Sequence, residues 1–225
     1  MSEAGRSMLK AAQSVAFEIE KHAETFSELN EPRYHNRLHF ADALTSISVQ
    51  LAILVMLKKE ANQDWMACAL LTCIAHDFFH PGKVNLVESE IERQSVNFLK
   101  PILKSHSVPD EWRKIIDTVI VRSDFAVVHQ NHAHVAGKAF EWNLKWLCVL
   151  LNEADVMASA SAKFGPELGE SLAQEWRLID FPLHSSVASL EGRKNFLKQL
   201  IFSSPSSLVL GLGERISEEI LSINS

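Results

Sequence analysis

Apolar residues recur at helical spacing along almost the whole chain, and β-type alternation of apolar and polar residues is rare. Breaker residues such as Pro32, Pro81-Gly82 and Pro182 separate the periodic segments. The pattern predicts helices at about residues 8–29, 38–60, 63–78, 86–104, 109–122, 132–161, 164–178, 187–203 and 206–222. We therefore expect an all-α protein whose residues 1–225 form a single-domain orthogonal helical bundle.

Three clusters of polar, metal-type residues interrupt these apolar segments, at residues 34–39, 76–82 and 152–155. A buried imidazole or carboxylate is costly unless it is paired or bound to a metal ion. Three such clusters in core-like segments therefore predict one shared site, which we interpret as that of a metal-dependent hydrolase.

Local spacing indicates how the first two clusters are arranged. His35, His39 and Asp42 fall on one face if their segment is helical. His76 and Asp77 are adjacent, and adjacent helical residues diverge by about 100°. Both side chains reach one ion most easily near the end of a helix, and Pro81 and Gly82 favour such an end.

The same residues resemble a known family. Residues 34–42 are similar to the YHNxxHxxD motif, and residues 76–85 to the HDxxHPGxxN motif, of the catalytic domain of class I cyclic nucleotide phosphodiesterases. With Asp155, they resemble the H…HD…D ligand set of the wider superfamily of HD-domain metal-dependent phosphohydrolases. The resemblance places a motif-bearing core at about residues 30–203.

The resemblance implies phosphoester hydrolysis with two divalent ions, and Zn, Mn, Mg, Fe, Co and Ni all remain open. It implies that one ion is held by His39, His76, Asp77 and Asp155, and that Asp77 bridges to a second, largely hydrated ion. His35 would protonate the leaving oxygen, and His80 would orient the attacking water. Asp42 and Asp124 would each hydrogen-bond to an imidazole and fix its tautomer. The implied substrate contacts are Tyr34, Asn36, Arg193 and Phe196.

One departure from the family affects the expected substrate. The phosphodiesterases read the purine with a glutamine three residues before a phenylalanine, and Arg193 stands at that position before Phe196. Arginine has only hydrogen-bond donors, so it cannot reproduce the donor and acceptor of an amide. Gln199 or Gln174 are other candidates for base reading. The expected substrate is therefore a small phosphoester, with nucleotides among the candidates.

Two other functions are compatible with the residues. Some HD-domain proteins add two histidines and use a di-iron centre for oxygen chemistry, and His106 with His129, His132 or His134 would supply them. Alternatively, the metal site serves a catalytically silent metal or nucleotide sensor. Coordination by the added histidines would separate the oxygenase from the hydrolase.

Composition further restricts the class of protein and its expected location. The formal charge of −6 argues against a nucleic-acid-binding protein. The three cysteines form no CxxC spacing, which indicates a reducing compartment, and no uninterrupted apolar run reaches ~18 residues. We expect a cytoplasmic protein without a membrane partner, whose apolar segment 208–212 packs on the bundle or on a second subunit.

Overall fold

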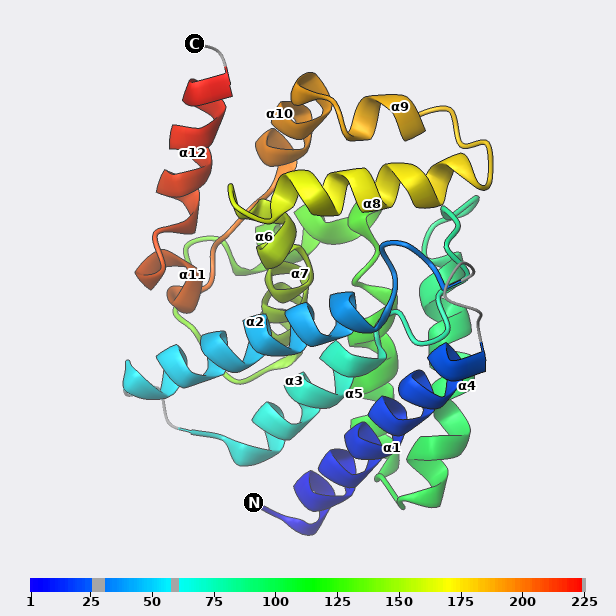
Figure 1. Ribbon diagram of the computed structural model, residues 1–225. Coiled ribbons are helices and arrows are strands. Elements are labelled where there is room, and N and C mark those ends of the chain that lie inside the picture. The colour runs from blue at the N-terminus through cyan, green and yellow to red at the C-terminus, as the bar shows by residue number, and fades with distance from the viewer. Residues whose placement is uncertain (26–30, 58–60, 224–225) are drawn as a thin grey trace.

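A computed structural model describes residues 1–25, 31–57 and 61–223. The described residues contain α-helices, one 3₁₀ turn and no strand, which confirms the all-α helical bundle (Figure 1). The predicted helix ends at residues 26–29 and 58–60 lie outside the described residues. The elements are α1 (Glu3–Thr25), α2 (Arg37–Met56), α3 (Gln63–Ala75), α4 (Glu90–Ser105), α5 (Asp110–Val121), η1 (Phe125–Val127), α6 (Val128–Val135), α7 (Leu144–Ala160), α8 (Gly165–Arg177), α9 (His184–Val187), α10 (Leu190–Gln199), α11 (Pro205–Val209) and α12 (Leu212–Ile223).

Helices α3 and α7 lie at the centre of the bundle. α3 packs against α1, α2, α5 and α7, and α7 packs against α2, α5, α6 and α8. Residues 67–75 of α3 are almost entirely buried, because apolar side chains occur on every side of this helix. The three helices nearest the metal-type clusters, α2, α3 and α7, are therefore core helices.

Helix α2 is, among the described residues, the one helix long and apolar enough to cross a membrane. It packs against α3, α7 and α11, and 44% of its most apolar window is buried inside the protein. These contacts are typical of a core helix.

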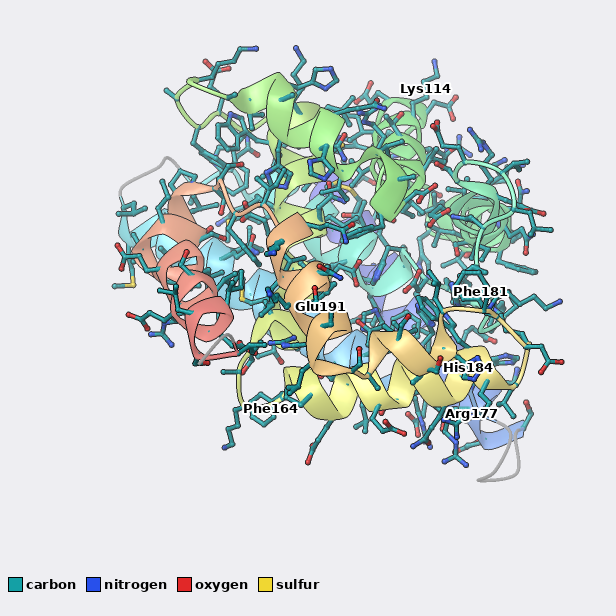
Figure 2. The ribbon with its side chains drawn as sticks, turned by 90° about the horizontal axis from the view of Figure 1, so that it is seen from above. Lys114, Phe164, Arg177, Phe181, His184 and Glu191 are labelled. Atoms are coloured by element: carbon teal, nitrogen blue, oxygen red, sulfur yellow. The ribbon has the colours of Figure 1, made fainter. Side chains whose placement is uncertain are left out.

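Helices α8, α9, α10 and α12 form an outer layer over one end of α7. α8 packs on α7 and α9, and α10 packs on α9 and α12. Figure 2 shows α8, α9 and α10 along this side, with Arg177, His184 and Glu191 among its labelled side chains. A small second core joins α10 and α12 to the end of α7 through Ala160, Leu197 and Ile216.

Two long predicted helices are each broken in two. The predicted helix at 132–161 is wrong, because residues 136–143 separate α6 from α7. Gly137 has a φ of +70°, and the Asn143 side chain caps α7 by accepting from the amides of Lys145 and Trp146. The predicted helix at 206–222 is interrupted in the same way at Gly211, whose φ is +63°.

Other boundaries differ by several residues. α3 ends at Ala75 rather than at 78, α4 begins at Glu90 rather than at 86, and α10 ends at Gln199 rather than at 203. The short helix α9 was not predicted. The early end of α3 matters most, because it places His76 and Asp77 just beyond the helix.

Candidate metal centre

The first motif forms a capped helix start rather than one continuous helical face. The Asn36 side chain accepts hydrogen bonds from the amides of Leu38 and His39, so α2 begins at Arg37. His35 precedes the helix, and the expectation that it shares a helical face with His39 and Asp42 is wrong. His39 is buried in the first turn, whereas Asp42 is exposed on α2 and is not brought into the cluster.

The second motif lies where α3 ends. His76 Nδ1 lies 2.7 Å from the Cys73 carbonyl, so Nδ1–H donates there and Nε2 faces the cluster. The amide of His80 donates to the carbonyl of Asp77 in the turn that follows. Phe79 in this turn has a φ of +61°, an uncommon conformation for a bulky residue and a source of local strain. The turn lets His76 and Asp77 converge.

Helix α7 supplies the fourth residue, Asp155. Its neighbours in the third cluster have other partners: Asn152 bonds to Asn131 and to the carbonyl of Arg122. Glu153 accepts from the amides of Ser203 and Ser204 and from the Ser207 hydroxyl. Asp155 is therefore the member of this cluster that joins the histidines.

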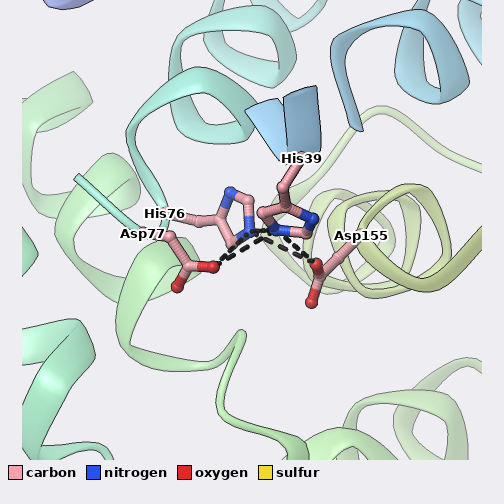
Figure 3. A group of neighbouring side chains, drawn as sticks. All are labelled: His39, His76, Asp77 and Asp155. Atoms are coloured by element: carbon pink, nitrogen blue, oxygen red, sulfur yellow. Dashed lines mark hydrogen bonds and ion pairs between the residues drawn. The ribbon is translucent and has the colours of Figure 1, made fainter. Parts of the chain in front are cut away.

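The four side chains converge on one point, as Figure 3 shows. His39 Nε2 lies 3.4 Å from His76 Nε2, 3.3 Å from Asp77 Oδ2 and 3.2 Å from Asp155 Oδ1. His76 Nε2 lies 3.2 Å from Asp77 Oδ2 and 3.3 Å from Asp155 Oδ1. Neighbouring ligands of one divalent ion are about 3.0–3.5 Å apart when each is about 2.0–2.2 Å from the ion. The donor atoms are thus spaced to hold one metal ion.

Charge within this cluster is strongly coupled. Burial alone would lower the pKa of His39, but its hydrogen bonds to Asp155 and Asp77 raise it to about 9. The pKa of His76 is also raised, because the same two carboxylates outweigh its burial. Burial opposes ionisation of Asp77 and Asp155, but the neighbouring histidines hold both carboxyl pKa values below their usual range. In the metal-free protein the two carboxylates therefore favour the protonated form of the imidazoles, and a divalent cation bound there would compensate the same negative charge.

A second group lies beside the first and contains a residue that the sequence analysis missed. Glu175 of α8 is buried, and its Oε1 lies 2.5 Å from His35 Nδ1. Its Oε2 accepts from the backbone amides of Tyr34 and His35 at 2.9 and 3.1 Å. Helical spacing could have identified Glu175 from the sequence. Leu168, Leu172 and Glu175 fall on one face of the helix, and a carboxylate on an otherwise apolar face is unusual.

This second group is hydrogen-bonded rather than arranged around an ion. His35, His80 and Glu175 each offer a donor atom within 4.8 Å of the other two. The 2.5 Å separation between His35 and Glu175 is the length of a short charge-assisted hydrogen bond and is too short for two ligands of one metal. We therefore assign His35 and Glu175 as an imidazole and its orienting carboxylate.

His80 is held in a defined tautomer next to this pair. Its ring stacks on His35 with centroids 3.6 Å apart, and its Nδ1 accepts from the Gly82 amide at 3.1 Å. Burial and the nearby His35 lower the pKa of His80 to about 3. The ring is thus neutral at physiological pH, and Nε2 carries its proton.

Two further carboxylates, Glu92 of α4 and Asp124 just before η1, lie near Asp77. Asp124 is buried and accepts from the amides of Ser89 and Ala126 at 2.6 and 2.9 Å, so its partners are backbone amides and not the expected imidazole. Glu92 is buried and bonds to Asn85. Burial, together with the negative charges of Asp124 and Asp77, raises the pKa of Glu92 to about 7. Glu92 was not predicted as a site residue.

The expected substrate residues are occupied by internal contacts. The Tyr34 hydroxyl pairs with the hydroxyl of Ser159, and the Asn36 amide donates to the carbonyl of Arg33. Arg193 is buried against Glu219 and three backbone carbonyls. Phe196 packs in the small second core. These contacts account for all four residues without a substrate.

The additional histidines of the oxygenase alternative have other partners or positions. His106 Nε2 bonds to the Ser14 hydroxyl, and His132 Nδ1 bonds to the Ser203 hydroxyl. His129 is exposed on α6, and the His134 carbonyl accepts from Lys138. In the part of the chain that the structure describes, none of them belongs to a group whose atoms can share an ion. No observation therefore favours the di-iron centre.

Comparison with known proteins leaves the family open. No protein-family model matches this chain, and a search of curated proteins finds no match. The likeness to phosphodiesterase motifs rests on residues 34–42 and 76–85.

Proposed function

We propose that this protein is a metal-dependent phosphohydrolase, a phosphodiesterase that acts on a nucleotide or a related phosphoester. The observation that carries the proposal is the set of four convergent donor atoms from His39, His76, Asp77 and Asp155, with five separations of 3.2–3.4 Å. A separate imidazole–carboxylate pair beside this set supports acid–base chemistry.

The residues present fit a divalent metal ion. Two imidazoles and two carboxylates suit Zn, Mn, Fe, Co or Ni, and the carboxylates Glu92 and Asp124 near Asp77 suit a second, more hydrated ion such as Mg or Mn. When bound, such ions lower the pKa of water toward neutrality and offset charge that develops on the phosphoryl oxygens.

His35 is the proposed general acid. Its Nδ1–H donates to Glu175, which fixes the tautomer and the orientation of the ring. Its Nε2 lies 3.9 Å from Asp77 Oδ2 and thus faces the cluster. A proton on Nε2 is therefore placed to pass to the leaving oxygen of a phosphoester beside the cluster, and Glu175 keeps the ring oriented afterwards.

His80 has a different role because it is neutral. With Nδ1 accepting from Gly82, its Nε2–H is a donor and cannot take up a proton near neutral pH. We assign it to orienting the attacking water by hydrogen bonding. The two stacked histidines thus have different roles: His35 transfers a proton, and His80 positions the attacking water.

No residue is assigned to recognise the base of a nucleotide substrate. Arg193 is occupied by Glu219 and by carbonyls, so a recognition element equivalent to the family's glutamine is not assigned. The substrate class is accordingly defined by its phosphoester group.

The three cysteines are free and buried, which fits a reducing compartment, and we place the enzyme in the cytoplasm.

The test uses metal-stripped protein that is reloaded with Mn, Mg, Zn or Fe. Hydrolysis of bis-p-nitrophenyl phosphate, p-nitrophenyl phosphate and cyclic nucleotides is followed for the wild type, for Asp77→Ala and for the exposed control Asp42→Ala. We expect metal-dependent hydrolysis that Asp77→Ala abolishes and Asp42→Ala retains. Tight metal binding without turnover of any substrate would instead favour the sensor.

A further inference from the structure

Arg193 of α10 is clamped by Glu219 of α12. Its Nε donates to Glu219 Oε1 at 2.8 Å, and its Nη2 donates to Oε2 at 3.0 Å, so the two groups pair through both oxygens. Both side chains are about nine-tenths buried. A bidentate pair with little water around it holds a defined geometry, which fixes the position of the guanidinium.

The other donors of Arg193 reach the end of α7. Nη1 donates to the carbonyl of Ser159, and Nη2 lies 3.3 and 3.2 Å from the carbonyls of Ala160 and Ser161. The last carbonyls of a helix lack partners within the helix, and a cation there also compensates the helix dipole. Gly165 makes room for this approach, because a Cβ at that position would overlap the guanidinium.

The contact continues from α7 to the first motif. The hydroxyl of Ser159 pairs with the hydroxyl of Tyr34 at 2.9 Å. The Tyr34 ring packs against His35 and His39, with ring centroids 4.8 and 5.0 Å apart. Ser159 is therefore held from two sides, by Arg193 at its carbonyl and by Tyr34 at its hydroxyl.

We propose that Arg193 and Glu219 are positioning residues that fix Tyr34, and through its ring the two histidines His35 and His39, by holding the end of α7. Helix α12 thereby becomes part of the support of the candidate site. Asp155 lies one turn before Ser159 on the same helix, so a displaced α7 end alters both sides of the metal cluster. The placement of Tyr34 does not depend on what the site catalyses, whereas the kinetic consequence rests on the proposed function.

The chain offers a direct reporter, because Tyr34 is its only tyrosine. Protein labelled with 3-fluorotyrosine gives one ¹⁹F resonance, whose shift and width report the surroundings of Tyr34. Glu219→Gln and Arg193→Lys weaken the clamp and keep similar side-chain volumes. Their matched controls are Glu218→Gln, at an exposed neighbour, and Lys194→Gln, which removes a partner of Glu191.

We expect the resonance to shift or broaden in Glu219→Gln and Arg193→Lys and to stay unchanged in both controls. An unchanged resonance in both clamp variants, with the fold retained by circular dichroism, would overturn the proposal. So would equal changes in the clamp variants and their controls.

A kinetic experiment separates this inference from the proposed function. Where the wild type hydrolyses a phosphodiester, we expect Tyr34→Phe and Glu219→Gln each to lower kcat about threefold to tenfold, and the double variant to be no slower than the slower single variant. Multiplied losses in the double variant would mean that Glu219 does not act through Tyr34. If the wild type has no activity, the ¹⁹F result alone decides the clamp, and the function proposal fails separately.

Discussion

Metal binding at the candidate centre should depend steeply on pH. In the metal-free protein the carboxylates of Asp155 and Asp77 raise the pKa of His39 to about 9. A metal ion needs the neutral imidazole, so binding must displace this proton. Because the pKa is raised, the proton is bound below pH 9, and the apparent affinity falls as the pH falls.

The size of the effect follows from that pKa. At pH 7 only ~1% of His39 is neutral, so the apparent affinity is ~100-fold below its limit at high pH. Each pH unit between 6 and 8 changes the affinity about tenfold if one proton is released. The slope approaches two decades per unit if His76, whose pKa is also raised, releases a second proton.

The assay is calorimetric titration of metal-stripped protein with Co²⁺ at pH 6, 7 and 8. Each pH is measured in two buffers of different ionisation enthalpy, which gives the number of protons released. We expect about one to two protons for each ion bound, and unchanged values for the exposed variant Asp42→Asn. An affinity independent of pH, with no proton release, would refute the charge assignment of the cluster.

Three further predictions test neighbouring parts of the site. Glu175→Gln should slow hydrolysis of alkyl phosphodiesters about 10²-fold and that of p-nitrophenyl esters far less, because p-nitrophenolate leaves without a proton; equal losses in a steady-state comparison would argue against His35 as the acid. Gly82→Ala adds a Cβ 3.3 Å from Glu175 Cγ at a φ of +66°, whereas Gly137→Ala adds one in open space at a φ of +70°. Thermal unfolding should show about 1–2 kcal/mol of destabilisation for both, while activity is lost only in Gly82→Ala. Burial lowers the pKa of His132 to about 4, so the unfolded chain takes up this proton first as the pH falls. The free energy of unfolding should drop by about 3 kcal/mol more between pH 6.5 and 4 in the wild type than in His132→Gln, as urea titrations would reveal.

The fold class and the metal-type cluster are readable from the sequence because both depend on local patterns. Helical periodicity survives in segments whose apolar faces are buried, and the three clusters stand out as polar residues inside such segments. The sequence predicts that His39, His76, Asp77 and Asp155 share one site, and in the structure their side chains converge. The metal that binds there, and the reaction, stay predictions.

The parts that the sequence analysis missed depend on long-range contacts. Glu175 approaches His35 from α8, 140 residues away in the sequence, and nothing local pairs the two. Arg193 was expected to contact substrate, but its neighbours are Glu219 and the end of α7, which are set by how the outer layer packs. Helix breaks at Gly137 and Gly211 were missed because apolar periodicity continues across both.

The most direct test of the central claim is the rate of bis-p-nitrophenyl phosphate hydrolysis as Mn²⁺ is titrated into metal-stripped protein, for the wild type and Asp155→Asn. The account predicts no turnover without metal, a rise that saturates as the site fills, and a loss of at least about 100-fold in Asp155→Asn. Turnover that is independent of metal, or undiminished in Asp155→Asn with the fold intact, would contradict it.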